Sequence, residues 1–179
     1  MTTTMIETGT ARRRRTTRRT SSEFLAGEID GVLIRAPQRH RDGRGWLVEL
    51  FREDELAWEL RPRMSYVSET QPGQARGPHE HQHQTDCFAF IGPGDFEIYL
   101  WDNRKDSATY RRQYRVVAGV TNPCIVIIPP GVVHAYRCLG NTPGWVFNAP
   151  NQLYAGEGRR SPVDEIRHED DPDSPYVLD

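Results

Sequence analysis

Lysine is almost absent from this chain of 179 residues, in which Lys105 is the only lysine among 23 basic residues. Because Lys105 lies in the turn-like stretch "DNRKDS", we set Schiff-base chemistry aside. Long apolar runs are absent too: none approaches the roughly 20 residues of a membrane span, and the N-terminus has no apolar signal core. These absences favour a cytoplasmic protein without a membrane partner.

Cysteine pairs with metal-site or redox spacing are also missing. Cys87, Cys124 and Cys138 show no CxxC pattern, and their odd number in a cytosolic setting predicts free thiols. The charge is uneven, since residues 1–22 hold six arginines and one glutamate. We expect this segment to be a solvated, disordered arm. No aromatic residue is interleaved with its arginines, so nucleic acid is not expected as a partner.

Short β-rich runs, separated by Gly, Pro, Asn and Asp, make up most of the chain and indicate an all-β sandwich or barrel. These runs cover residues 46–51, 64–70, 86–91, 96–101, 114–119, 124–129, 132–139 and 145–149. The segment 53–61, "EDELAWELR", favours one short flanking helix. We predict a basic arm over 1–22, one barrel domain over 23–155, and an irregular acidic tail over 156–179 that packs on the barrel.

Histidines form the most informative motif. His79, His81 and His83 occupy alternate positions, which point to one face if the strand is extended. His79-x-His81-x4-Asp86 and the later Pro-x-Gly-x2-His134 resemble the two cupin motifs, which bring three histidines and a carboxylate together in the mouth of a jelly-roll barrel. Such ligands suit Fe, Mn, Ni or Zn. A polar edge without chemistry is the alternative.

A longer resemblance covers residues 42–150. "DGRGWLVELF", the Arg76–His79 segment "RGPH", "DNRKDSATY" and "IPPGVVH" follow one another in the order and spacing of the dTDP-4-dehydrorhamnose 3,5-epimerase family, which is itself cupin-like. The resemblance implies a cupin-type jelly-roll barrel, a homodimer, a nucleotide-linked sugar as substrate, and an isomerase that needs no cofactor. In this chemistry a base removes a proton next to a keto group and an acid returns one.

The resemblance also assigns roles to single residues. His79 matches the base, and its partner carboxylate is expected from the acidic tail, at Asp170 or Asp171. The positions that match substrate-binding residues are Arg44, Glu49, Arg76 and His134.

Two family residues have no counterpart. The lysine falls near Asp86 or Cys87, and the tyrosine acid falls at Phe147, so Tyr154 or Tyr136 would have to supply the proton. Three hypotheses remain. The first is a divergent epimerase acting on a dTDP-4-keto-6-deoxy sugar. The second is a metal-dependent cupin oxygenase, isomerase or lyase that uses His79, His81, Asp86 and His134 on a small keto or enol substrate. The third is a ligand-binding protein without catalysis.

Overall fold

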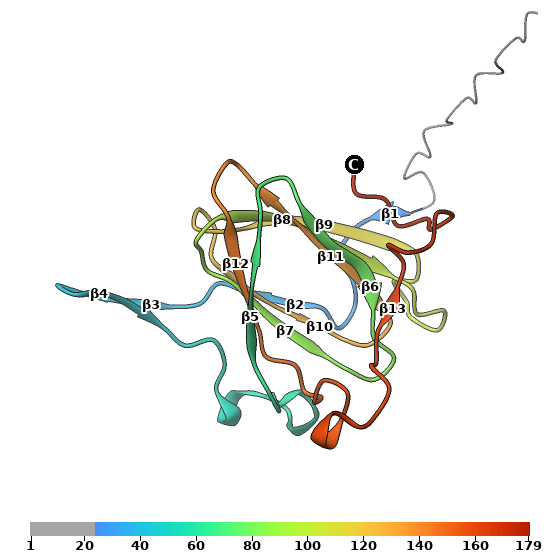
Figure 1. Ribbon diagram of the computed structural model, residues 1–179, viewed down its shortest axis with the longest axis horizontal. Coiled ribbons are helices and arrows are strands. Elements are labelled where there is room, and N and C mark those ends of the chain that lie inside the picture. Colours follow the sequence, from blue (N-terminus) through green and yellow to red (C-terminus); the bar gives the residue numbers. More distant parts are fainter. Residues whose placement is uncertain (1–23) are drawn as a thin grey trace, which may run out of the picture.

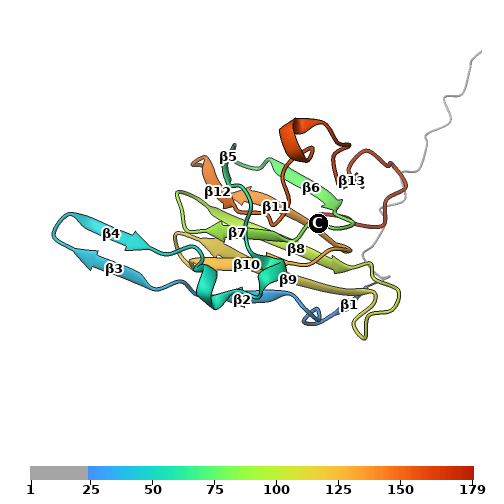
Figure 2. The same ribbon diagram turned by 90° about the horizontal axis from the view of Figure 1, so that it is seen from below.

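Two facing β-sheets make up the body of the protein, as a computed structural model that describes residues 24–179 shows (Figures 1 and 2). The six-stranded sheet has the order β1 (Leu25–Ala26), β9 (Arg112–Gly119), β8 (Asp95–Asp102), β11 (Val132–Leu139), β6 (Ala75–Glu80) and β13 (Ile166–Arg167). The five-stranded sheet has the order β2 (Leu33–Arg35), β10 (Cys124–Ile128), β7 (Asp86–Phe90), β12 (Gly144–Asn148) and β5 (Tyr66–Thr70). A hairpin of β3 (Arg39–Asp42) and β4 (Gly45–Val48) stands apart.

The strand order is that of a jelly roll. From β5 to β12 the chain crosses between the two sheets at nearly every connection, and most neighbouring strands are antiparallel. Each of the eight β-rich runs overlaps one strand, so the all-β jelly-roll prediction is confirmed. Within residues 24–179 the strands form two sheets and a hairpin, without one continuous closed barrel.

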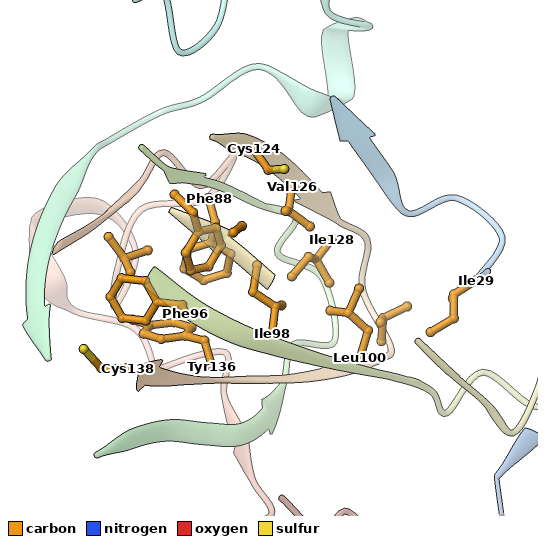
Figure 3. Close-up of a cluster of buried hydrophobic side chains, with 14 residues drawn as sticks. Ile29, Phe88, Phe96, Ile98, Leu100, Cys124, Val126, Ile128, Tyr136 and Cys138 are labelled. Atoms are coloured by element: carbon orange, nitrogen blue, oxygen red, sulfur yellow. The ribbon is translucent and has the colours of Figure 1, made fainter. Parts of the chain in front are cut away.

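The main core lies between the sheets, where alternate residues of each strand point inward. On β8, Phe96, Ile98 and Leu100 pack there against Phe88 and Tyr136 (Figure 3). The intervening residues Tyr99 and Trp101 are also fully buried, because Tyr176 of the C-terminal segment covers the outer face of β8. Both faces of this central strand are therefore apolar, and the polar site described below lies near one end of the core.

The predicted helix over 53–61 is wrong. The segment contains two separate 3-10 turns, η1 (Glu53–Glu55) and η2 (Trp58–Leu60). Leu56 and Ala57 between them have ψ angles of 139° and 146°, which are incompatible with a continuous helix. The segment contains four acidic residues, and neither turn contains a buried residue, so tertiary packing does not favour one continuous helix.

The C-terminal segment runs beside β6, where β13 pairs with it and brings residues 164–168 to the edge of the six-stranded sheet (Figure 1). The third short 3-10 turn, η3 (Glu157–Arg159), precedes it. The predicted arm over 1–22 lies outside the described residues. No helix in the described part of the chain is long and apolar enough to cross a membrane.

Candidate active site

Two histidines face each other across neighbouring strands. His79 on β6 lies opposite His134 on β11, and their ring centroids are 4.4 Å apart. The backbones approach closely here, because Gly77 has a φ of +80° and a Cβ on it would lie 2.5 Å from the carbonyl oxygen of His134. This glycine, part of the "RGPH" segment, allows β6 to carry His79 over the end of the core.

Asp86 enters the same place from the opposite sheet, at the start of β7. Its Oδ1 accepts hydrogen bonds from the side-chain amides of Gln84 (2.9 Å) and Asn148 (2.8 Å). Its Oδ2 lies 3.1 Å from Nε2 of His81 and 3.3 Å from Nε2 of His134. One buried carboxylate therefore joins two histidines from two strands.

His81 reaches the cluster from a bend, because β6 ends at Glu80. The side-chain carboxylate of Asp164 accepts hydrogen bonds from the backbone N–H groups of Gln82, His83 and Gln84. The backbone carbonyl oxygen of Asp164 contacts Nδ1 of His81. The strand expected to continue through His83 thus stops before it, and His83 is exposed.

The charges of the cluster are strongly coupled. Burial, with the nearby charges of His134 and His81, lowers the pKa of His79 to about 2, so this imidazole is neutral near pH 7. Burial alone would lower the pKa of His81, but the neighbouring carboxylate of Asp86 outweighs it and raises that pKa to about 9. Burial alone would raise the pKa of Asp86, and the two histidines hold it well below its usual range. Asp86 is therefore ionised, and the site stabilises a positive charge beside it.

A cavity of about 930 Å³ opens above this cluster. His79 and His81 line it, together with Arg76, Tyr66, Tyr136 and Tyr154. His134 and Asp86 are buried beneath these residues and do not line it. The volume is at the upper end of the range for small-molecule sites. It suits a ligand larger than a small keto acid.

The carboxylate beside His79 is Glu165, whose Oε1 lies 3.9 Å from Nδ1 of His79. Glu165 belongs to the acidic tail but lies five residues before Asp170, the residue expected to pair with His79. Asp170 and Asp171 are exposed, and no ion pair between either of them and His79 occurs among the described residues. The reason is register: Arg167 pairs with His79 along the strand, so the chain has already passed the histidine at residue 170.

Phe147 faces away from the site. Along β12 the side chains alternate, with Val146 in the main core and Asn148 bonded to Asp86. Phe147 therefore packs on the outer face with Cys87 and Ala89. Three tyrosines line the cavity instead, at positions 66, 136 and 154. Asn148 and Tyr66 were missed in the sequence; the alternation of the run 145–149 is the signal that could have identified Asn148.

Arg44 and Glu49 do not line the cavity. Both belong to the projecting hairpin and the residues after it, where Arg44 pairs with Asp42 and Glu49 with Arg52. Arg76 does line the cavity, and its guanidinium donates to the side chain of Thr70 and the carbonyl of Glu69. Of the four residues expected to bind substrate, only Arg76 reaches the cavity of its own chain.

His79, His81 and His134 form the cluster whose donor atoms suit a metal ion. One nitrogen from each lies within 4.8 Å of the others. Cys87, Cys124 and Cys138 are free, buried and elsewhere in the fold.

Comparison with known proteins identifies the family. The dTDP-4-dehydrorhamnose 3,5-epimerase family matches residues 26–168. The spore coat polysaccharide biosynthesis protein SpsL of Bacillus subtilis is 38% identical over 115 residues, which are 64% of this chain and 75% of SpsL. The probable low-salt glycan biosynthesis epimerase Agl13 of Haloferax volcanii is 36% identical over 127 residues, which are 70% of this chain and 81% of Agl13.

Solved structures share the fold. A dTDP sugar isomerase from Desulfovibrio desulfuricans G20 superposes with a TM-score of 0.70 at 24% identity, covering 84% of this chain and 94% of that one. The 4-keto-6-deoxy sugar epimerase NovW of Streptomyces spheroides gives a TM-score of 0.68 at 21% identity, covering 84% and 75%. The resemblance seen in the sequence is therefore confirmed, and the chain belongs to the dTDP-4-dehydrorhamnose 3,5-epimerase family.

Proposed function

We propose that this protein inverts a carbon next to the keto group of a dTDP-4-keto-6-deoxy sugar, with His79 as the base. The observation that carries the proposal is a neutral imidazole on the wall of a large cavity, with the Glu165 carboxylate beside its Nδ1. His79 takes the proton from the C–H bond, and the bond electrons move to the keto oxygen as an enolate. The imidazolium that forms is stabilised by Glu165.

The proton that completes the inversion comes from Tyr66. Its hydroxyl oxygen accepts a hydrogen bond from the amide of Asn148 at 2.9 Å, so its own O–H is left to donate into the cavity. Burial raises the pKa of Tyr66 to about 12, which keeps the phenol protonated as a donor must be. Tyr154 is a weaker candidate because its side chain is more exposed (56%) than that of Tyr66 (45%), and the hydroxyl of Tyr136 is paired with Ser68.

The size of the cavity and the positive charges that line it support a nucleotide-linked sugar as the substrate. The cavity exceeds the needs of a small keto acid, and three arginines line it at positions 76, 159 and 167. Guanidinium groups suit the diphosphate of such a substrate. Arg167 is already paired with Glu165, so we assign the diphosphate to Arg76 and Arg159.

The test is proton exchange in D₂O with dTDP-4-keto-6-deoxyglucose, followed by proton NMR. We expect deuterium to enter the carbon next to the keto group and an epimerised sugar to accumulate. In Tyr66→Phe, exchange should continue while epimerised product falls by about 10²-fold, because removal and return of the proton are separate steps. The matched variant Tyr154→Phe should behave as wild type. No exchange in the wild type would overturn the function, and loss of product in Tyr154→Phe alone would overturn the choice of donor.

We also propose a homodimer in which the hairpin enters the site of a second copy. The hairpin projects from the body (Figures 1 and 2), and its residues Trp46 and Leu47 are 45% and 61% exposed. Arg44 and Glu49, which the family resemblance assigns to substrate, contact no cavity residue of their own chain among the described contacts. A second copy would cover the apolar residues and bring Arg44 to a diphosphate.

Light scattering on a sizing column should give a molar mass twice that of one chain for the wild type. The double variant Trp46→Glu, Leu47→Glu should have the mass of a single chain. Complementation tests the position of Arg44. Arg44→Ala and His79→Gln chains are each expected to be poorly active, but mixed dimers contain one site with an intact His79 and an intact Arg44. Recovery of activity on mixing supports the exchange of hairpins, and a monomeric wild type would contradict it.

A further inference from the structure

The bend that follows β6 directs three successive backbone N–H groups at one carboxylate. Gln82 donates to Oδ1 of Asp164 at 2.9 Å. His83 and Gln84 donate to Oδ2 of the same residue, at 2.8 and 2.9 Å. Successive N–H groups that converge in this way form a binding site for an anion. Hydrogen bonds to an ionised acceptor are also stronger than those between neutral groups. The bend is therefore an anion site that is occupied by a carboxylate from the C-terminal tail.

The side chain and the backbone of Asp164 both act on this bend. While the carboxylate binds residues 82–84, the backbone carbonyl contacts Nδ1 of His81. In the described structure, the hydrogen bonds that join residues 162–164 to the rest of the barrel all involve Asp164. Asp164 is thus the link between this part of the tail and the bend that carries His81.

The position of Glu165, the next residue, depends on the register between β13 and β6. Its Oε1 lies 3.9 Å from Nδ1 of His79, and Arg167 holds its other carboxylate oxygen at 2.9 Å. A slip of one residue would turn the Glu165 side chain to the opposite face of the sheet. β13 contains only two residues, whereas most strands have roughly three to ten. So short a strand needs a further contact to define its register.

The carboxylate of Asp164 supplies that contact. One residue of a strand spans roughly 3.3 Å, so a slip would carry the carboxylate beyond hydrogen-bond distance of the bend. After β13, the N–H groups of His168 and Glu169 donate to the carbonyl of Pro78, at 2.9 and 3.1 Å. Glu165 lies between these two attachments, along the edge where β13 runs beside β6 (Figures 1 and 2). Asp164 therefore fixes the tail on the side that precedes Glu165.

We propose that Asp164 is a positioning residue for the base, because it holds the tail in the register that places Glu165 beside His79. The inference rests on the proposed function, in which Glu165 stabilises the imidazolium of His79. Both carboxylate oxygens of Asp164 are engaged by the bend, so its charge faces the bend and not the reacting atoms. Loss of Asp164 should therefore slow the chemical step without weakening the binding of substrate.

A double-mutant cycle tests whether Asp164 acts through Glu165. Proton exchange into dTDP-4-keto-6-deoxyglucose is followed by proton NMR in D₂O for the wild type, Asp164→Ala, Glu165→Gln and the double variant. We expect Asp164→Ala to lower kcat by about 10- to 10²-fold, as a misplaced catalytic group does, with KM unchanged. In the Glu165→Gln background the same substitution should lower kcat by less than about twofold, since the two effects are not additive. An equal loss in both backgrounds would show a merely structural role and overturn the inference.

Two further variants control for damage to the fold. Asp164→Asn keeps an oxygen acceptor for His83 and Gln84 and loses the bond from Gln82, so its kcat should lie between those of the wild type and Asp164→Ala. Asp170→Ala removes an exposed carboxylate further along the tail and should match the wild type. A loss in Asp170→Ala as large as that in Asp164→Ala would contradict the assignment to Asp164.

Hydrogen-exchange mass spectrometry tests the positioning without the reaction. The amides of residues 82–84 and of β13 should be protected in the wild type and exchange about tenfold faster or more in Asp164→Ala. They should stay protected in Asp170→Ala. Unchanged protection of β13 in Asp164→Ala would overturn the inference. If β13 responds as expected but the wild type exchanges no proton into the sugar, the proposed function fails while the role of Asp164 in setting the register stands.

Discussion

Replacing His79 with glutamine is expected to lower the rate of proton exchange into dTDP-4-keto-6-deoxyglucose by about 10²- to 10⁴-fold. Glutamine keeps a polar side chain of similar reach at the cavity wall, but its amide cannot accept the proton that the neutral imidazole takes. The rate is measured by proton NMR in D₂O with substrate at saturation, so that binding does not limit it. Circular dichroism melting confirms that the variant is folded.

His168→Gln is the matched control. His168 also comes close to β6, where its Nε2 lies 3.0 Å from Glu80, but it does not line the cavity. A glutamine amide can still reach Glu80, so exchange should proceed at the wild-type rate. If His79→Gln retains more than about one tenth of that rate, His79 is not the base, because a general base contributes at least about 10²-fold.

Replacing Asp102 with alanine is expected to lower the free energy of unfolding by about 3 kcal/mol, the lower end for breaking a buried ion pair. The Asp102 side chain is completely buried and accepts hydrogen bonds from Arg104 (2.9 Å), Ser107 (2.6 Å) and Thr109. Arg104 and Thr109 in turn hold the backbone of Asp30, which precedes β2. Loss of the carboxylate therefore leaves a guanidinium and two hydroxyls without their shared acceptor. Urea unfolding with an unchanged m-value measures the effect.

The same carboxylate makes this contribution dependent on pH. Burial alone would raise the pKa of Asp102, but its hydrogen bonds outweigh burial and lower that pKa to about 2. A lowered pKa in the folded state stabilises the protein above the usual pKa of 3.8, and this stabilisation is lost as the pH falls towards 2. The difference between wild type and Asp102→Ala should therefore shrink over that range. Asp106→Ala, an exposed carboxylate in the same turn, should change stability by less than about 0.5 kcal/mol, and an equal loss in both variants would contradict the argument.

The spacing of residues within the two histidine motifs indicates which side chains lie together in the site. His79, His81, Asp86 and His134 come together as their motifs indicate, because β6 and β7 follow one another and β11 pairs with β6. Glu165 and Asp164 were not predicted, since the register between β13 and β6 decides which tail residue meets His79. Nothing in the tail's composition distinguishes these carboxylates from Asp170.

Strands were predicted where apolar residues alternate with polar ones, whereas β6 is absent from the eight β-rich runs and was expected only from the alternation of its histidines. β6 contains Gly77 and Pro78 within "QPGQARGP", which is typical of a turn. It forms a strand because β11 and β13 pair with it on either side. This stabilisation by strand pairing is not reflected in the local β-propensity of the sequence. The helix expected over 53–61 fails for a related reason, since neither of the two turns that replace it buries a residue in the described structure.

By itself the sequence determined the jelly-roll class, the family and the histidine cluster, because hydrophobic alternation and motif spacing are local properties of the chain. The tertiary structure alone decided which carboxylate supports His79, that Phe147 faces outward while Asn148 holds Asp86, and that Arg44 lies outside the cavity of its own chain. Those outcomes depend on pairing register between distant strands. A shift of one residue in such a register turns every side chain to the opposite face.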